Sequence, residues 1–160
     1  MSEYSVRLTT ATDALFIAEL SRLPHVAGQL NPVEESDVVA ALLQAPKISL
    51  VITSNQRAVA HVLSELQEGW YLGIRFLAVA YERRGIGKFT LDWILHDAFV
   101  TRGLHRVALE VPTNNVAARA LYERCGMLYE GTQRDGMRDV RTGAFRDLAN
   151  YAILRSEWKS

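Results

Sequence analysis

Hydrophobic residues recur along the chain with two different periods, and the order of these periods predicts the fold class. Apolar residues at alternate positions predict strands, whereas spacings of three and four residues predict amphipathic helices. Strand-like patterns cover residues 5–8, 47–54, 57–66, 70–79, 105–111, 127–132 and 144–158. Helix-like patterns cover residues 15–23, 33–45, 86–103 and 114–126. The resulting order, β-α-α-β-β-β-α-β-α-β-β, is typical of an α/β (α+β) domain.

Turn-forming residues mark the ends of several of these elements. Pro24 and Pro46 are expected to end the first two helices, because proline lacks the amide hydrogen that a helix interior needs. The stretch HVAGQLNP after Pro24 is therefore predicted to be a loop. Asn55 is expected in a hairpin turn, and Gly103 just beyond the end of the third helix, where glycine is common.

The segment WYLGIRFLAV, residues 70–79, has an irregular hydrophobic pattern. Apolar residues alternate up to Phe76, and the phase then slips by one position to Leu77 and Val79. In a strand, such a slip either moves the buried face or marks an extra residue, a β-bulge. Because bulges often flank functional sites, this strand is a candidate for part of one.

Composition indicates one globular domain covering residues 1–160. The chain is 49% hydrophobic and 22% charged, and its formal net charge is zero. A neutral chain has no long-range attraction for nucleic acid or an anionic membrane, so neither is expected as a partner. No segment reaches the ~20 apolar residues that span a bilayer. The N-terminal sequence lacks signal-peptide features and Cys125 is the single cysteine, so we expect a cytoplasmic protein.

The sequence YERRGIGK joins the irregular strand to the next helix and combines two glycines with three basic side chains. It does not match the nucleotide-binding P-loop, because Glu82 stands where that motif has its first glycine. Nor does it match the dinucleotide fingerprint, which requires glycine where the chain has Thr90. The free N–H groups at a helix start favour phosphate, and glycines let the main chain approach it. From these residues alone, phosphate binding and a plain glycine turn with solvated charges remain alternatives.

Two motifs resemble those of the GNAT N-acetyltransferase superfamily. YERRGIGKFTLDWIL resembles motif A, [QR]-x-x-G-x-[GA], with Gly85 and Gly87 in the glycine positions and Glu82 in place of the usual glutamine or arginine. Further along, NNVAARALYERCGM resembles motif B through Asn115, Ala118, Leu121, Tyr122, Glu123 and Gly126. The flanking segments are most similar to the branch that includes the ribosomal-protein N-terminal acetyltransferases (RimJ/RimL-like).

The resemblance implies a single-domain GNAT fold. Its mixed, mostly antiparallel sheet would have about seven strands and about four helices, with a bulged fourth strand splayed from the fifth. Acetyl-CoA would be the cosubstrate, with its pantetheine arm held by the main chain of Leu77 and Val79 and contacted by Asn115. Its pyrophosphate would be held by Arg83, Arg84, Gly85, Ile86, Gly87 and Lys88. No metal is expected, because the histidines lack metal-ligand spacing.

The resemblance also implies direct attack of a neutral primary amine on the thioester, through a tetrahedral intermediate. This chemistry uses a general acid and a general base. Tyr122 matches the family's general acid, and the resemblance favours this role, although the position of Tyr122 on an apolar helix face is also typical of a core tyrosine. The base is left open between Glu65 and Glu110, because a carboxylate raised in pKa by partial burial accepts a proton. Cys125 is interpreted as a helix-face residue rather than a nucleophile.

The remaining polar segments are interpreted as structural. The charged run RDGMRDVRTGAFRD, residues 134–147, alternates in sign and predicts a solvated hairpin with weak surface ion pairs rather than an acceptor-binding segment. The isolated histidines His25, His61, His96 and His105 are likewise predicted to be structural.

Two hypotheses for function follow. The first is an acetyl-CoA-dependent N-acetyltransferase (EC 2.3.1 class) that acts on a small-molecule or peptide amine, as a monomer or homodimer. The second is a non-catalytic CoA- or acyl-CoA-binding regulatory module, which the unassigned base leaves open. The acceptor is not identified, because the N-terminal helices that would contact it match the family only in pattern.

Overall fold

The computed structural model describes residues 3–44 and 47–159. The described strands are β1 (Tyr4–Leu8), β2 (Lys47–Ser54), β3 (Arg57–Gln67), β4 (Tyr71–Val79), β5 (Arg106–Pro112), β6 (Leu128–Arg138) and β7 (Phe145–Leu154). The helices are η1 (Ala11–Asp13, 3₁₀), α1 (Ala14–Ser21), α2 (Pro24–Ala27), α3 (Glu35–Leu42), α4 (Ile86–His96), η2 (Asp97–Thr101, π) and α5 (Val116–Arg124).

The strands form one mixed sheet in the order β1-β2-β3-β4-β5-β7-β6. Neighbouring strands are antiparallel except β4 and β5, which are parallel. Parallel neighbours need a long crossover connection, and α4 supplies it here. The predicted fold class, a mixed, mostly antiparallel sheet of about seven strands, is confirmed.

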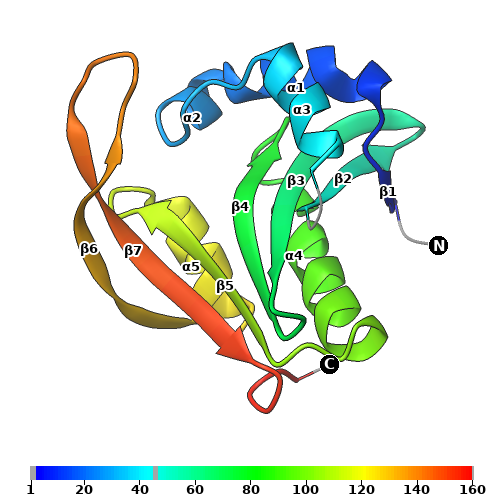
Figure 1. Cartoon of the computed structure of the whole chain (residues 1–160), viewed down its shortest axis with the longest axis vertical. Helices are drawn as coiled ribbons and strands as arrows, with labels where there is room; N and C mark the ends of the chain where they lie inside the picture. Colours follow the sequence, from blue (N-terminus) through cyan, green and yellow to red (C-terminus); the bar gives the residue numbers. More distant parts are fainter. Residues whose placement is uncertain (1–2, 45–46, 160) are drawn as a thin grey trace.

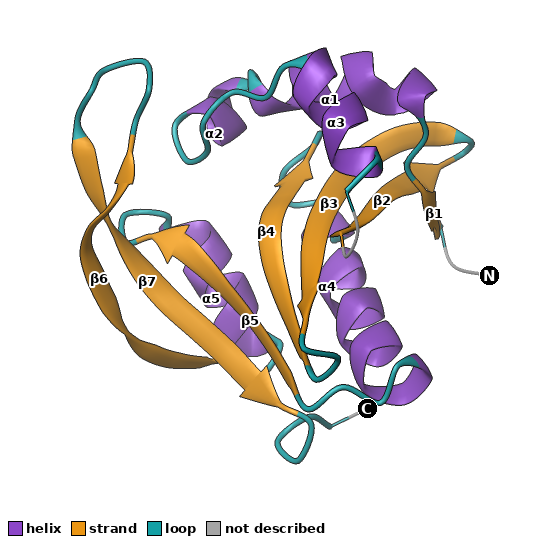
Figure 2. Ribbon diagram, viewed as in Figure 1, coloured by secondary structure: helices purple, strands orange, loops and turns teal. Residues whose placement is uncertain are grey.

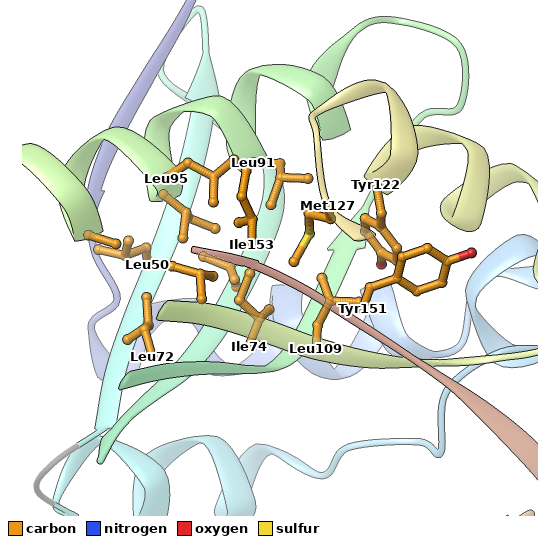
Figure 3. Packing of buried hydrophobic residues seen from close by; sticks show 14 of the residues in the cluster. Leu50, Leu72, Ile74, Leu91, Leu95, Leu109, Tyr122, Met127, Tyr151 and Ile153 are labelled. Carbon is orange, nitrogen blue, oxygen red and sulfur yellow. The ribbon is translucent and has the colours of Figure 1, made fainter. Parts of the chain in front are cut away.

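Helices cover both faces of this sheet (Figures 1 and 2). Leu91 of α4 and Leu109 of β5 belong to the main hydrophobic cluster, part of which Figure 3 shows. Leu20 of α1 and Val26 of α2 pack instead with Phe76 in a second cluster. The two clusters share no buried residue, so the sheet separates two cores, one on each side.

Strand β4 contains an extra residue, Arg75. Consecutive β3 residues Leu63 and Ser64 pair with Phe76 and Ile74, which leaves Arg75 without a partner in the register. Ile74 packs in the main cluster and Phe76 in the second cluster, so the bulge changes the face to which side chains point. The bulge therefore lies one residue before the predicted slip between Phe76 and Leu77.

Beyond this bulge, β4 and β5 separate. They pair only from Tyr71 to Ile74 in β4 and from Arg106 to Leu109 in β5. The remaining parts of the two strands diverge towards α2 and the tip of the β6–β7 hairpin (Figure 1). The predicted splay of the fourth strand from the fifth is confirmed, and it leaves the facing edges of both strands without strand partners.

The N-terminal region differs from prediction in two respects. The stretch after Pro24 is not entirely loop, because Pro24 starts the short helix α2, where its missing N–H is not needed. Helix α3 ends at Leu42, and Pro46, which was expected to end it, lies outside the described residues. None of the described helices combines the length and apolar character that a membrane crossing requires.

Candidate functional site

The splayed strands form two walls of a cleft of about 360 Å³. Its lining comes from β4 between Ile74 and Val79, from β5 between Leu109 and Pro112, from the segment 81–88, and from α5 and α2. The glycine turn and the second motif, which are separate in the sequence, therefore meet at one place. Because the strand edges here lack strand partners, their N–H and C=O groups are available to a ligand.

The glycine turn presents free main-chain N–H groups to this cleft. Gly85 has a φ of 75° and is the N-cap of α4, and the Phe89 N–H donates to the Gly85 carbonyl at 3.0 Å. This is the first helical bond of α4, so the N–H groups of Ile86, Gly87 and Lys88 have no main-chain partner within the described residues. Such a cluster at a helix start attracts anions.

Gly87 also sets how closely α4 approaches α5. A Cβ atom at this position would lie 3.0 Å from Leu121 Cδ2, which is too close unless the leucine moves. The two glycines thus have different roles: Gly85 provides the left-handed backbone turn, and Gly87 allows close packing at the cleft wall.

Strand β1 anchors the glycine turn from the other side. The Tyr4 hydroxyl donates to the Arg84 carbonyl at 2.7 Å, and the rings of Tyr4 and Phe89 lie 5.3 Å apart. The turn is therefore tied to the sheet and to α4 at the same time. This anchoring fixes the orientation of the free N–H groups before any ligand arrives.

The basic side chains of the turn are not equivalent. Lys88 Nζ lies 2.5 Å from Asp92 Oδ2, and this hydrogen bond raises the pKa of Lys88. Arg83 and Arg84 are exposed and have no ion-pair partner among the described residues. The two arginines are thus the uncompensated charges beside the free N–H groups.

The edge of β4 directs main-chain groups into the cleft. The Ala80 N–H donates to Val59 on β3 at 2.7 Å, so alternation along the strand turns the polar groups of Val79 and Leu77 the other way, towards β5. His25 Nε2 of α2 lies 2.9 Å from the Val79 carbonyl, which agrees with that direction. His25 therefore lines the site, a location that an isolated histidine gives no sequence signal to predict.

Tyr122 extends from α5 into the base of the cleft. Its side chain is 7% exposed, and burial raises the pKa of its hydroxyl to about 12. Its ring centroid lies 5.9 Å from that of Tyr151, and Figure 3 shows the two side chains near each other. Among the hydrogen bonds of the described residues, none involves the Tyr122 hydroxyl. Asn115 caps the same helix by accepting from the Ala118 N–H at 3.2 Å, so its side-chain oxygen is engaged and its amide nitrogen is the group left to a ligand.

The two candidate bases occupy different environments. Glu110 lines the cleft at the point where β5 leaves β4, and it is exposed rather than partly buried as expected. Glu65 lies outside the cleft lining, and its Oε2 accepts from Arg75 Nε at 3.1 Å. The structure thus brings Glu110, but not Glu65, together with Tyr122.

A second hollow, of about 450 Å³, continues from the cleft on the side of β5 and β7. Arg75 and Arg106 line it, and both are paired: Arg106 binds Glu130 through two bonds, of 2.8 and 2.5 Å, which lower the pKa of Glu130. Glu110 lines this hollow as well and has no ion-pair partner among the described residues. Where the two hollows meet, the lining therefore holds Arg75, which is paired with Glu65, and Glu110, which is not paired.

The charged run of residues 134–147 forms a hairpin that is mostly exposed, as predicted, but the ion pairs of Asp139 are not the weak surface pairs that were expected. Asp139 is only 2% exposed and accepts from Arg141 Nε at 3.1 Å and Arg146 Nη2 at 2.8 Å, bonds that hold its pKa below the ordinary value. Arg141 also donates to the Leu30 carbonyl at 3.2 Å, and Arg146 donates to the Gly28 carbonyl. These three side chains, here called the hairpin clamp, tie the β6–β7 hairpin to the segment after α2.

A sheet opened between two parallel strands, with a helix start and a tyrosine facing the opening, defines the fold class of coenzyme A-dependent acetyltransferases. The chain belongs to the acetyltransferase (GNAT) family, whose model matches residues 15–127. Part of the chain is 34% identical over 84 residues to the "Putative ribosomal N-acetyltransferase YdaF" of Bacillus subtilis, a match that covers 52% of this chain and 45% of that protein. This relative agrees with the branch that the motifs resemble.

Solved structures share the fold along nearly the whole chain. The ribosomal-protein-S18-alanine N-acetyltransferase from Escherichia coli superposes with a TM-score of 0.79 at 20% identity, covering 98% of this chain and 96% of that one. A point mutant of the spermidine N-acetyltransferase SpeG from Vibrio cholerae gives a TM-score of 0.82 at 20% identity, with the same coverage. At these identities the likeness shows the fold alone.

Proposed function

We propose that this protein is an N-acetyltransferase that moves an acetyl group from acetyl-CoA to a primary amine, on a protein N-terminus or a small molecule. The observation that carries the proposal is the coincidence of three features in one cleft. These are the unpaired N–H groups at the start of α4, the splayed edge of β4 and the unpartnered hydroxyl of Tyr122. If residues 82–88 formed only a structural glycine turn, there would be no reason for the splayed edge of β4 and the hydroxyl of Tyr122 to lie in the same cleft.

The cosubstrate fits the groups that the cleft offers. The N–H groups of Ile86, Gly87 and Lys88, with the exposed Arg83 and Arg84, would bind the pyrophosphate. The β4 edge at Leu77 and Val79 would pair with the amides of the pantetheine arm as a neighbouring strand would. Asn115 would contact the arm from α5. Glu82 reduces the positive charge of the turn, but it does not remove a main-chain donor.

The chain's own residues would then move two protons. Glu110 would accept a proton from the attacking amine, directly or through water, as the new N–C bond forms. Tyr122 would donate its hydroxyl proton to the sulfur as the C–S bond breaks, so that a neutral thiol leaves. A tyrosine hydroxyl is protonated throughout the neutral range, so the proton is in place when the bond breaks; burial raises the pKa of Tyr122 to about 12 and extends this to higher pH.

A thiol-release assay tests this proposal. Purified protein with acetyl-CoA is offered spermidine, an alanine-starting peptide amide and simple alkylamines, and release of free thiol is followed against time. We expect turnover with at least one acceptor, with the acetylated amine confirmed by mass spectrometry. Saturable acetyl-CoA binding without turnover on the whole panel would instead support the regulatory-module hypothesis.

A further inference from the structure

Gln29 occupies the wall shared by the cleft and the second hollow. It follows α2, and its side chain lines both spaces. Its Oε1 atom is buried and has no hydrogen-bond partner within the described chain. A buried oxygen without a donor is costly, so such an atom at the edge of a cavity indicates a position where a ligand supplies the missing N–H.

The main chain on both sides of Gln29 is held in place. The hairpin clamp donates to the carbonyls of Gly28 and Leu30, which are its two neighbours in the sequence. Asn31 makes two more bonds to the hairpin, donating to the Arg138 carbonyl at 3.0 Å and accepting from the Val140 N–H at 3.1 Å. The backbone that carries Gln29 is therefore fixed across the opening.

The surrounding charges indicate what kind of donor fits. Arg75 and Arg106 already have carboxylate partners, whereas Glu110, which lines both hollows, has none among the described residues. The junction therefore combines one unpaired carboxylate, one unpaired amide oxygen and Arg75, whose charge is paired with Glu65. The carboxylate and the amide oxygen accept hydrogen bonds, and together they suit a protonated amine.

We propose that Gln29 binds the acceptor amine: its Oε1 accepts a hydrogen bond from the amine nitrogen while Glu110 lies ready to take the proton. The hairpin clamp positions Gln29 for this contact. This inference rests on the proposed function, because it names the residue that receives the substrate of that reaction. It also explains why a hairpin of distant sequence is fixed so firmly to the segment after α2.

The experiment compares Gln29→Met, which keeps the length of the side chain but removes the acceptor, with Gln29→Glu, which keeps an oxygen. For the best of the assayed amines, Gln29→Met should raise the acceptor KM about tenfold or more, the effect of losing a hydrogen bond to a charged donor. Gln29→Glu should restore KM to within about threefold of the parent value. The affinity for acetyl-CoA should not change in either variant. The same Met substitution at Gln67, outside both hollows, is the matched control.

Asp139→Asn tests the positioning role, since it weakens the clamp without touching the cleft. It should raise the acceptor KM and leave acetyl-CoA affinity unchanged, whereas a general loss of folding would impair both. An unaltered acceptor KM in Gln29→Met overturns the inference.

A readout that does not need turnover separates this inference from the proposed function. The side-chain amide resonances of Gln29, identified by their absence in Gln29→Met, should shift when spermidine or the peptide amide is added to the protein with coenzyme A. A shift of these resonances in a protein without turnover would contradict the enzyme hypothesis but support amine binding at Gln29. If the enzyme is active and the resonances do not shift, the proposed role of Gln29 is wrong.

Discussion

The two sides of the cleft are built in different ways. The side that we propose binds acetyl-CoA, the cofactor side, consists of main-chain groups from one continuous stretch, in which the end of β4, the glycine turn and the start of α4 follow one another in the sequence. The side that we propose binds the amine, the acceptor side, depends on side chains that reach across the molecule, such as Arg146, which bonds to Gly28 from 118 residues away. The first side therefore depends on backbone conformation and the second on the hairpin clamp.

Because of this difference, substitutions on the two sides are expected to affect different binding properties. A phosphate site made of main-chain groups tolerates side-chain variation as long as the turn keeps its glycines. A wall held by side-chain contacts can be altered one residue at a time without disturbing the cofactor site. We therefore expect variants on the two sides to separate acetyl-CoA affinity from acceptor affinity.

The largest effect is expected on the cofactor side, from Gly87→Asp. A carboxylate at the start of α4 opposes the attraction of the free N–H groups for phosphate, so acetyl-CoA affinity measured by calorimetry should fall about a hundredfold or more. Gly87→Ala is the control, because its Cβ has the same contact with Leu121 but carries no charge. If both variants bind acetyl-CoA equally well, the assignment of the pyrophosphate site is wrong.

The next largest effect is expected where the two sides meet, at Tyr122. Tyr122→Phe removes the proposed acid and should lower kcat about a hundredfold, while acetyl-CoA affinity stays the same. Because the folded-state pKa is about 12, the parent enzyme should keep its acid as pH rises through 10 and lose it only nearer 12. Single-turnover kinetics should be used to confirm that chemistry limits the rate, and an unchanged single-turnover rate in Tyr122→Phe would exclude the acid role.

A smaller effect is expected from substituting the candidate bases, Glu110 and Glu65, one at a time. Glu110→Gln should lower kcat/KM about tenfold at neutral pH, and raising the pH should recover part of the loss as more free amine becomes available. Glu65→Gln should have little effect, because Glu65 lies outside the cleft and a glutamine can still accept from Arg75. If Glu65→Gln lost activity while Glu110→Gln kept the parent kcat/KM, Glu65 rather than Glu110 would be the base.

The smallest predicted effect concerns the charge of the acceptor. Because Arg75 and Arg106 are paired and Glu110 is not, alaninamide should have a KM about fivefold lower than free alanine. Glu130→Gln would release Arg106 and should narrow this difference, while leaving acetyl-CoA affinity unchanged. Equal KM values for the two acceptors would show that the second hollow does not sense the carboxylate.

The local geometry of the proposed cofactor side could be predicted from the sequence, whereas that of the proposed acceptor side could not. Gly85 and Asn115 act within a few residues of their own position, through a turn and a helix cap, so local pattern reveals these two features. The contact of Gly87 with Leu121 joins two helices, and the local pattern does not reveal it. The bulge was placed one residue late, because Phe76 is hydrophobic and buried on whichever face it points to.

The acceptor side could not be predicted in the same way. Gln29 and His25 lie on a short helix and the segment after it, and neither has a periodic pattern. The hairpin clamp was taken for a solvated run because alternating charges are usually exposed, and only the folded chain shows that Asp139 is 2% exposed. A contact between segments more than a hundred residues apart leaves no trace in a local pattern.

The bulge at Arg75 means that the cleft depends on the length of β4 more than on the chemistry of any side chain. Deleting this one residue would leave Phe76 and Leu77 on their present faces and in their present register with β3, but it would remove the bulge at which β4 begins to leave β5. Point substitutions change such a protein gradually. A single-codon deletion here would remove the opening between β4 and β5 in one step, although it would barely alter the composition of the chain.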